Sequence, residues 1–345
     1  MSTQHRLDSE DQLIRRIQRW TSGLRKPRSL HESIGDDAAV FEGRKGHLTL
    51  LSTDALVQGV HFDLRYTGPA DLGWKALAVN LSDIAAMGGT ARYFTTSICV
   101  PKTLPPDFLD AFYRGMARLA KQHQVHLVGG DTCASRRDLF IDVAITGEVK
   151  ASELLTRSGA RPGDWLFVSG ELGGSAMGLE LLRRRQTIPS RCRKLVRRHL
   201  RPEPRLQVGR YLARRRLASA MIDLSDGLST DLHRLCQRSQ VGALIESSQI
   251  PIPSILPKLL SKPVLSYALH GGEDYELLFA VPPQLGSRVP RRIFGIPVRR
   301  VGQITGQRGK VLLSAGNHAV LVASEGFDHF RKTGRGSSET APLSL

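Results

Sequence analysis

One apolar stretch restricts the fold more than any other part of the chain: Lys75-Ala76-Leu77-Ala78-Val79-Asn80-Leu81-Ser82-Asp83-Ile84-Ala85-Ala86-Met87-Gly88. The pattern from Asp71 to Met87 predicts a helix, and Gly88-Gly89 fits its C-terminal stop. A helix this apolar belongs in a core, yet Asn80 and Asp83 are three residues apart and share one face. The sequence therefore predicts a core helix from which a single carboxylate projects.

Strands and helices alternate around this helix. We expect strands at Leu48–Asp54, Tyr93–Val100, Val125–Val128 and Leu139–Val149, and a helix at Asp107–His123. The strand at Val125–Val128 is expected to run into a glycine turn, Gly129-Gly130. An amphipathic helix is expected to open the chain after Ser9. This alternation predicts an α/β domain over residues 1–150.

The second half of the chain repeats the alternation. A strand at Trp165–Ser169 precedes a helix, and further strands are expected at Ala218–Ile222 and Leu277–Val281. We expect a second α/β domain over residues 151–330, so the fold class is two-domain α/β (α+β). Residues 331–345 are rich in Ser, Gly and basic groups and are predicted to form a disordered tail.

The composition is that of an ordinary globular protein, with 345 residues of which 41% are hydrophobic and 23% charged. No segment approaches the roughly 18 apolar residues of a membrane-spanning helix, and the N-terminus lacks the apolar run of a secretory signal. We therefore expect no membrane partner and a cytoplasmic location. The cysteines, Cys99, Cys133, Cys192 and Cys236, have no paired spacing, which favours reduced, mostly buried thiols over a disulfide framework or a zinc site.

The formal net charge of +17 is the one feature that suits a nucleic-acid partner. The excess is concentrated between Arg183 and Arg216, where Tyr211 is the only aromatic residue of the kind that stacks on bases. A solvated helical surface is therefore favoured, and nucleic acid is disfavoured as a partner. The positive field would still help to collect anionic phosphate substrates.

Acidic residues recur in four short clusters at strand ends and glycine turns: Gly35-Asp36-Asp37, Ser52-Thr53-Asp54, Gly129-Gly130-Asp131-Thr132 and Asp223-Leu224-Ser225-Asp226-Gly227. If the fold brings them together, their carboxylates repel, and divalent cations can neutralise them. Oxygen ligands without clustered His or Cys suit Mg²⁺, which in proteins usually also holds substrate phosphates. Asp37 is the uncertain member, because in an Asp-Asp pair one residue commonly caps backbone N–H groups.

Nine segments resemble thiamine-monophosphate kinase, and the resemblance runs in order from about residue 10 to 330. They are Gly35–Ala39, Leu51–Asp54 leading to Gly59–Phe62, Lys75–Gly88, Gly129–Thr132, Thr156–Ala160, His199–Pro202, Asp223–Leu228, Gly271–Leu277 and Gly326–Phe330. The family belongs to a superfamily resembling aminoimidazole ribonucleotide synthetase. That resemblance implies two α/β domains, with the N-terminal domain pairing across a homodimer.

The resemblance also implies site residues. A site for several Mg²⁺ ions would fall on Asp36, Ser52, Thr53, Asp54, Asp83, Asp131, Asp223 and Asp226. Contacts to ATP would fall on Tyr113, Gly130, Asp131, Arg157 and Ser225. Contacts to thiamine monophosphate would fall on His61, Glu273 and Phe327, the last chosen over Phe330.

The implied reaction transfers the γ-phosphoryl group of ATP to thiamine monophosphate, giving thiamine diphosphate and ADP. A phosphate acceptor is largely ionised near neutral pH, its second pKa being about 6, so no general base is required and no catalytic side chain beyond the metal ligands is assigned. Direct in-line transfer is the hypothesis. The alternatives are another ATP-dependent enzyme of the same superfamily and a basic nucleic-acid-binding protein on this fold.

Overall fold

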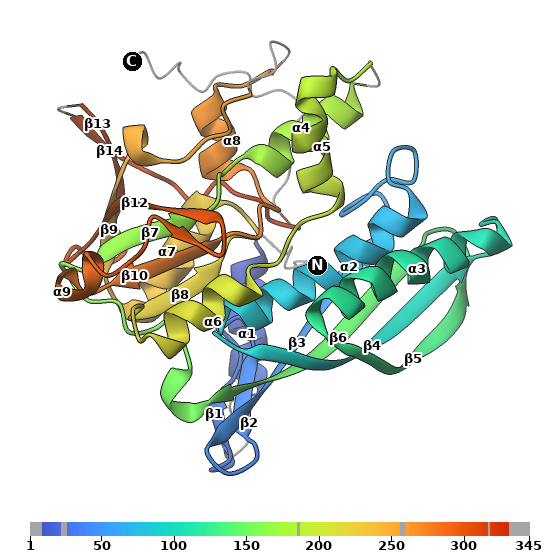
Figure 1. Cartoon of the computed structure of the whole chain (residues 1–345), viewed down its shortest axis with the longest axis horizontal. Helices are drawn as coiled ribbons and strands as arrows, with labels where there is room; N and C mark the ends of the chain where they lie inside the picture. Colours follow the sequence, from blue (N-terminus) through green and yellow to red (C-terminus); the bar gives the residue numbers. More distant parts are fainter. Residues whose placement is uncertain (1–8, 22–25, 185–186, 256–259, 317, 331–345) are drawn as a thin grey trace, which may run out of the picture.

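The computed structural model describes residues 9–21, 26–184, 187–255, 260–316 and 318–330, and it divides them between two mixed sheets (Figure 1). All strands of the first sheet precede residue 151, and all strands of the second follow residue 164. This agrees with the expected two-domain α/β class. The predicted tail, residues 331–345, lies outside the described residues.

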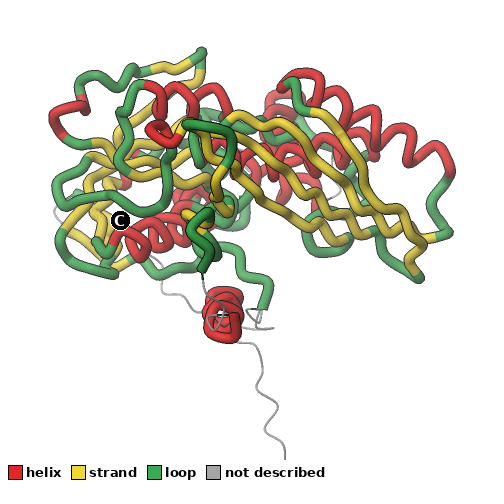
Figure 2. The backbone as a smooth tube through the Cα atoms, turned by 90° about the horizontal axis from the view of Figure 1, so that it is seen from below, coloured by secondary structure: helices red, strands yellow, loops and turns green. Residues whose placement is uncertain are grey.

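The first sheet is six-stranded, in the order β1-β2-β3-β6-β4-β5, and is antiparallel except for the parallel pair β4 and β5. Its strands are β1 (Leu30–Glu32), β2 (Ala39–Glu42), β3 (His47–Val57), β4 (Thr90–Pro101), β5 (His126–Ser135) and β6 (Phe140–Lys150). Helices α2 (Pro69–Ala86) and α3 (Pro106–His123) cover one of its faces (Figure 1). The other face carries no helix of the described chain (Figure 2).

Helix α2 is the predicted core helix, and it is buried along nearly its whole length. It packs closely against α3 because two glycines face the partner backbone. A Cβ added at Gly73 would lie 1.9 Å from the Phe112 carbonyl oxygen, and one at Gly115 would lie 1.9 Å from that of Ala70. Helix α2 connects the parallel strands β3 and β4, and α3 connects the parallel strands β4 and β5, so the two helices run in the same direction. Asp83 lies about 15 Å along α2 from this contact.

The alternation along β3 decides which of its polar side chains face the core. Leu50 and Leu56 are buried, and Ser52 and Asp54 lie on the same face because side chains alternate with a period of two. Leu51 and Thr53 lie on the opposite, exposed face. The edge strand β5 is exposed almost throughout and extends past the predicted end at Val128, because Gly129 and Gly130 continue the ladder with β4. The expected glycine turn is therefore part of a strand.

The second sheet has the order β14-β13-β9-β12-β7-β10-β8, with β11 paired to β12. Its strands are β7 (Trp165–Ser169), β8 (Ala220–Asp223), β9 (Gly242–Glu246), β10 (Leu277–Val281), β11 (Arg292–Ile293), β12 (Ile296–Thr305), β13 (Val311–Ala315) and β14 (His318–Leu321). Its helices are α4 (Gly174–Arg183), α5 (Arg193–Leu200), α6 (Leu206–Arg214), α7 (Leu228–Ser239), α8 (Val264–His270) and α9 (Pro283–Gly286). Short 3₁₀ turns lie at Ala151–Glu153, Ser190–Cys192 and Ser247–Gln249.

The two sheets share one hydrophobic core. Phe167, Met221 and Phe279 from β7, β8 and β10 belong to the same buried cluster as the apolar residues of α2, and α6 also packs against α2. The alternate residues of these strands, such as Ile222, pack in a second cluster that includes α7. This packing places the end of β8 beside α2, and so brings acidic residues of both halves together.

Helix α1 (Glu10–Thr21) is the predicted amphipathic opening helix, but none of its residues is buried. Trp20 is 67% exposed. Seen from below, α1 lies apart from both sheets (Figure 2). Its first turn is tied to the end of the described chain, because the backbone N–H of Glu10 donates to Asp328 Oδ1 at 3.2 Å. No helix in the described part of the chain is long and apolar enough to cross a membrane.

Candidate functional site

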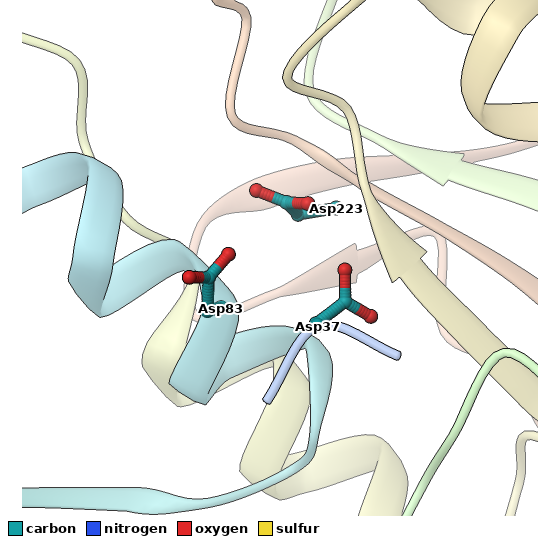
Figure 3. A group of neighbouring side chains, drawn as sticks. All are labelled: Asp37, Asp83 and Asp223. Carbon is teal, nitrogen blue, oxygen red and sulfur yellow. The ribbon is translucent and has the colours of Figure 1, made fainter. Parts of the chain in front are cut away.

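Three carboxylates converge where the two sheets meet (Figure 3). Asp37 comes from the loop before β2, Asp83 from the last turns of α2, and Asp223 from the end of β8. One oxygen of each lies within 4.8 Å of the others. We call these residues the acidic triad. It draws on both halves of the chain, as the distribution of acidic clusters predicted.

Burial and mutual repulsion make the triad costly to ionise. The pKa of Asp83 is raised well above its usual value by burial first and then by Asp54 and Asp223. The pKa of Asp223 is raised in the same way by burial and then by Asp37. Burial and then Asp226 raise the pKa of Asp54 to about 6. A cation bound here would stabilise the ionised carboxylates, whose charge is otherwise costly in the folded chain.

The donor set fits a hard divalent cation. The atoms that converge are all carboxylate oxygens, which Mg²⁺ prefers. Asp37 Oδ2 is buried and has no hydrogen-bond partner, so it has a free lone pair that a metal ion could use. The other two carboxylates are oriented by serines. Ser82 Oγ donates to Asp223 Oδ2 at 2.6 Å, and Ser52 Oγ donates to Asp83 Oδ2.

The Asp-Asp pair divides its roles in the opposite sense to our expectation. Asp36 turns away from the triad, and its two oxygens each accept the backbone N–H of Arg157 at 3.2 Å. Asp37 joins the triad, and its Oδ1 accepts Arg157 Nη2 at 2.6 Å. The chain enters this pair through Gly35, whose φ of +121° is one that glycine adopts readily. Burial, then Asp37, raises the pKa of Asp36 to about 7.

Asp226 and Ser225 lie in the loop between β8 and α7, next to the triad. Asp226 forms an ion pair with Arg234, which also bonds Asp231 Oδ1 at 3.1 Å. The carbonyl of Ser225 accepts the backbone N–H of Glu273 at 2.7 Å. This bond ties the acidic loop to the segment in which substrate contacts are predicted. Arg157 reaches the same region, since its Nη2 lies 2.6 Å from Asp37 Oδ1.

Four predicted residues are not brought to the triad within one chain. The Thr53 hydroxyl faces the exposed side of the sheet and donates to Asp142 Oδ1 at 2.9 Å. Asp131 and its neighbour Gly130 lie on β5, three strands from β3, which is about 14 Å at the usual strand spacing. Tyr113 lies next to Phe112 and thus level with Gly73, which is about 15 Å along α2 from Asp83.

Two of the predicted substrate contacts do come together. His61 and Phe327 have ring centroids 6.4 Å apart, and His329 lies between them at 4.9 Å and 4.8 Å. Phe327 is 44% exposed, so its ring is available to a ligand. His329 was not predicted, although it stands in the Gly326–Phe330 segment that carries the resemblance. Burial and then His329 lower the pKa of His61.

Glu273 pairs with two basic side chains that sequence reasoning missed. Its Oε1 lies 2.6 Å from Lys75 Nζ, and its Oε2 lies 3.0 Å from His199 Nδ1. Lys75 is 1% exposed and also donates to the His61 carbonyl at 3.2 Å. Burial alone would raise the pKa of Glu273, but Lys75 and then His199 outweigh it and hold that pKa well below its usual value. Glu273 is therefore an ionised, already paired carboxylate.

The backbone around Glu273 is also unusual. Glu273 and Tyr275 adopt φ values of +65° and +50°, a conformation that residues other than glycine rarely take. Strain of this kind is retained where the surroundings require it, which is common at ligand sites. Lys75 could have been found by the reasoning that found Asp83, since a lysine within an apolar helix needs a partner in the core.

Comparisons with known proteins agree with this geometry. Residues 35–149 match the family described as AIR synthase related protein, N-terminal domain, and residues 161–314 match its C-terminal domain. The thiamine-monophosphate kinase of Bacillus subtilis (strain 168) is 37% identical over 317 residues, which cover 88% of this chain and 97% of that protein. The thiamine-monophosphate kinase of Escherichia coli (strain K12) is 38% identical over 302 residues, which cover 86% and 91%.

A solved structure described as AaThiL complexed with AMPPCP and TMP superposes with a TM-score of 0.82 at 33% identity, covering 95% of this chain and 100% of that one. The similarity therefore extends over both sheets and over the junction that holds the acidic triad. The chain belongs to the thiamine-monophosphate kinase family, within the AIR synthase related proteins.

Proposed function

We propose that this chain transfers the γ-phosphoryl group of ATP to thiamine monophosphate, giving thiamine diphosphate and ADP, with Mg²⁺ held at the acidic triad. The observation that carries the proposal is the convergence of Asp37, Asp83 and Asp223 from the two halves of the chain. Membership of the family supports it, as does the relative whose description names AMPPCP and TMP together.

Asp37, Asp83 and Asp223 would hold Mg²⁺, which would supply positive charge to offset the repulsion between two phosphorylated reactants. The residues of the chain hold the ligand oxygens in position. Ser52 and Ser82 orient Asp83 and Asp223, while Arg157 fixes Asp37 and stays charged because the neighbouring carboxylates outweigh its burial. An acceptor phosphate with a second pKa of about 6 needs no general base, so direct in-line transfer is the simplest course.

We also propose that the site extends to more than one ion. Asp54 and Asp226 lie close enough for the charge of Asp226 to raise the pKa of Asp54. Together they could provide ligands beyond the triad. Asp36, Ser52 and Thr53 remain proposed ligands, although the Thr53 hydroxyl points to the other face of the sheet. Ser225 and Arg157 remain proposed contacts to ATP beside these ions.

The proposed dimer would bring to each site the predicted residues that lie far from it within one chain. Tyr113, Gly130 and Asp131 lie far from the triad of their own chain, so we propose that they serve the site of a second copy. The exposed face and edge of the first sheet carry Leu51, Tyr93, Leu127 and Val128, each more than 40% exposed. We call these four residues the apolar edge patch. Burial of such a patch would favour pairing of the N-terminal domains.

Subunit complementation tests this arrangement. Asp131→Asn and Asp223→Asn variants, each inactive alone, are co-expressed with different tags. If two copies share each site, random pairing makes about half of the dimers heterodimers, and each heterodimer has one intact site and one defective site. Roughly a quarter of wild-type activity should therefore return. The same variants mixed as folded, non-exchanging dimers are the control. Absence of any recovery on co-expression would show that Asp131 acts within its own chain or has no role.

The substrate contacts follow from the two groups described above. The rings of His61 and Phe327 form an aromatic pair that we propose holds the thiamine moiety, since aromatic faces attract cationic heterocycles. Glu273 is already neutralised by Lys75, so we propose that it positions His61 through that lysine rather than attracting the thiamine cation by itself.

The reaction is tested by ADP release on adding thiamine monophosphate, with free thiamine and aminoimidazole precursors as alternative substrates and with Mg²⁺ present or absent. We expect turnover only with thiamine monophosphate and Mg²⁺, and a loss of at least about 10³-fold in Asp223→Asn. Turnover without Mg²⁺, or with another acceptor at equal rate, would count against the proposal. We propose a cytoplasmic location, where ATP is available for the reaction.

Nucleic-acid binding is the second candidate and rests only on the net charge. A gel-shift titration across salt concentrations distinguishes it, because binding to the phosphate backbone weakens steeply with added salt. We expect no retardation at physiological salt.

A further inference from the structure

A basic pocket lies between helices α2, α3 and α5, outside the residues assigned to the proposed reaction. Its volume is about 370 Å³. Four arginines line it: Arg118 from α3, Arg193 and Arg197 from α5, and Arg201 just after α5. Asp71, in the first turn of α2, is the one acidic residue among the described residues of the lining. Four guanidinium groups against one carboxylate give the lining a formal charge of +3.

The spacing of residues along α5 explains how one side of the pocket is built. Arg193, Arg197 and Arg201 follow one another at intervals of four, so they lie in a row along one side of the helix. Val196 and Leu200 form a second row beside them at the same interval and supply an apolar wall. Part of the basic stretch that was expected to be only a solvated surface therefore lines a pocket.

Only part of the positive charge is neutralised by the protein itself. Arg201 forms an ion pair with Asp71, and Arg197 Nη2 lies 4.0 Å from Glu203 Oε1, which is the limit of an ion pair. The remaining two arginines of the pocket form no ion pair and no side-chain hydrogen bond with any residue that the structure describes. Two guanidinium groups are thus available to an anion from outside.

The arrangement is unfavourable while the pocket is empty. Like charges four residues apart on a helix repel, as Arg193 and Arg197 do. Arg193 is also the first residue of α5, where the helix dipole disfavours a cation. Arg118 adds a third positive charge from α3. A bound anion would offset the repulsion among these groups.

The pocket is separate from the acidic triad and from the proposed dimer surface. Asp71 and Asp83 are both on α2, and the twelve positions between them correspond to about 18 Å along the helix. The pocket is lined by helices on the helical side of the first sheet (Figure 1). The proposed dimer uses the opposite, helix-free face and its edge, so pairing of two copies would leave the pocket open.

We propose that this pocket binds the diphosphate group of a small organic phosphate, with Arg118 and Arg193 as its principal contacts. Guanidinium groups bind phosphate oxygens in bidentate fashion, and two arginines from different helices suit a group with two phosphates. The volume falls within the range of small-molecule sites, about 300–1,000 Å³, which leaves room for an organic part against Val196 and Leu200. This binding does not depend on the proposed reaction.

Calorimetric titration of the full-length protein with inorganic pyrophosphate in EDTA tests the anion contacts. EDTA removes the divalent cations through which the acidic triad would hold phosphates, so the titration reports binding elsewhere. We expect about one pyrophosphate per chain, and at least about tenfold weaker binding to Arg118→Gln/Arg193→Gln, which loses two charge-assisted contacts. Both changes are at exposed residues, so the urea unfolding midpoint of this variant should stay close to that of wild type.

The matched control is Arg299→Gln/Arg308→Gln, which removes two exposed arginines elsewhere on the chain. Its affinity for pyrophosphate should stay within about twofold of wild type, because distant surface charges are screened by salt. An equal loss in both double variants would show only a general attraction to a basic protein. That result, or an absence of binding to wild type, would overturn the proposal.

Two further titrations test the remaining assignments. Asp71→Asn should bind pyrophosphate more tightly, because the change releases the guanidinium of Arg201; weaker binding would overturn the assigned lining. ADP in the same EDTA buffer should bind more tightly than pyrophosphate, and Arg118→Gln/Arg193→Gln should lose that binding as well. ADP that binds no more tightly than pyrophosphate, or that binds the double variant as well as wild type, would exclude an organic phosphate as the ligand.

Discussion

Replacement of Lys75 by Met tests whether the buried pair with Glu273 organises the substrate side of the site. Lys75 Nζ lies 2.6 Å from Glu273 and 3.2 Å from the carbonyl oxygen of His61, and its side chain is 1% exposed. Methionine retains the length and apolar body of lysine, so little cavity is created. The change leaves Glu273 ionised beside His199 alone. Removal of one partner of a buried ion pair costs about 3–5 kcal/mol of unfolding free energy.

The cost should depend on pH in a defined direction. In the wild-type protein the pKa of Glu273 is held well below its usual value, so its contribution is present above about pH 4.5 and is lost only as pH falls through the lower folded value. Without Lys75, burial raises the pKa of Glu273 instead. The folded variant then binds a proton more readily than the unfolded chain, and its stability falls as pH rises. The difference from wild type should be larger at pH 8 than at pH 5.

Urea unfolding followed by circular dichroism at both pH values measures this difference. Lys102→Met, at an exposed lysine, is the matched control and should change the stability by less than about 0.5 kcal/mol. Adding Glu273→Gln to Lys75→Met should recover part of the loss, because the buried charge is then removed. A loss below about 1 kcal/mol, or an equal loss at both pH values, would refute the assigned pairing.

Three other predictions concern the triad and the core. Asp223→Asn should raise the melting temperature of the metal-free protein at pH 8, because the change removes a buried carboxyl group whose pKa is raised. A calorimetric scan in which the variant melts at a lower temperature than wild type would contradict the repulsion described here. Mg²⁺ should raise the wild-type melting temperature more at pH 8 than at pH 5.5, because burial and Asp226 raise the pKa of Asp54 to about 6. An equal rise in melting temperature at both pH values would argue against binding by these carboxylates. Gly115→Ala should destabilise the protein by more than about 3 kcal/mol, because the added Cβ would lie 1.9 Å from the Ala70 carbonyl oxygen. Gly129→Ala is the control and should have a small effect on urea unfolding, because the nearest atom to its added Cβ is at 3.9 Å. Similar unfolding midpoints for the two variants would contradict the packing of α2 on α3.

The elements with strong periodicity were predictable from the sequence. The core helix expected from Asp71 to Met87 is α2 at Pro69–Ala86, and the strand expected at Leu277–Val281 is β10 with the same bounds. The prediction that Asp83 projects from an otherwise buried helix is confirmed, because every residue of α2 from Leu72 to Ala86 except Asp83 is buried. A polar residue inside an apolar helix is informative because burial without a partner is costly.

What the sequence did not reveal depends on geometry between elements. Asp37 rather than Asp36 joins the triad, and neighbouring residues of the same type carry no sequence signal for that choice. The contact of Cys99 with Cys133, whose sulfur atoms lie 3.0 Å apart, depends on strand register, which a β-bulge between Phe94 and Thr95 shifts. Such an irregularity has no pattern that alternation of apolar residues would disclose.

The acidic triad has a consequence for biosynthesis of the chain. Asp37 and Asp223 are separated by more than half of the 345 residues, so the ribosome must deliver the larger part of the polypeptide before the three oxygens can meet. A nascent or truncated product that stops before Asp223 would lack one wall of the cation site. The cation binding proposed for the triad should thus appear late during synthesis, and only once β8 has been added to the second sheet.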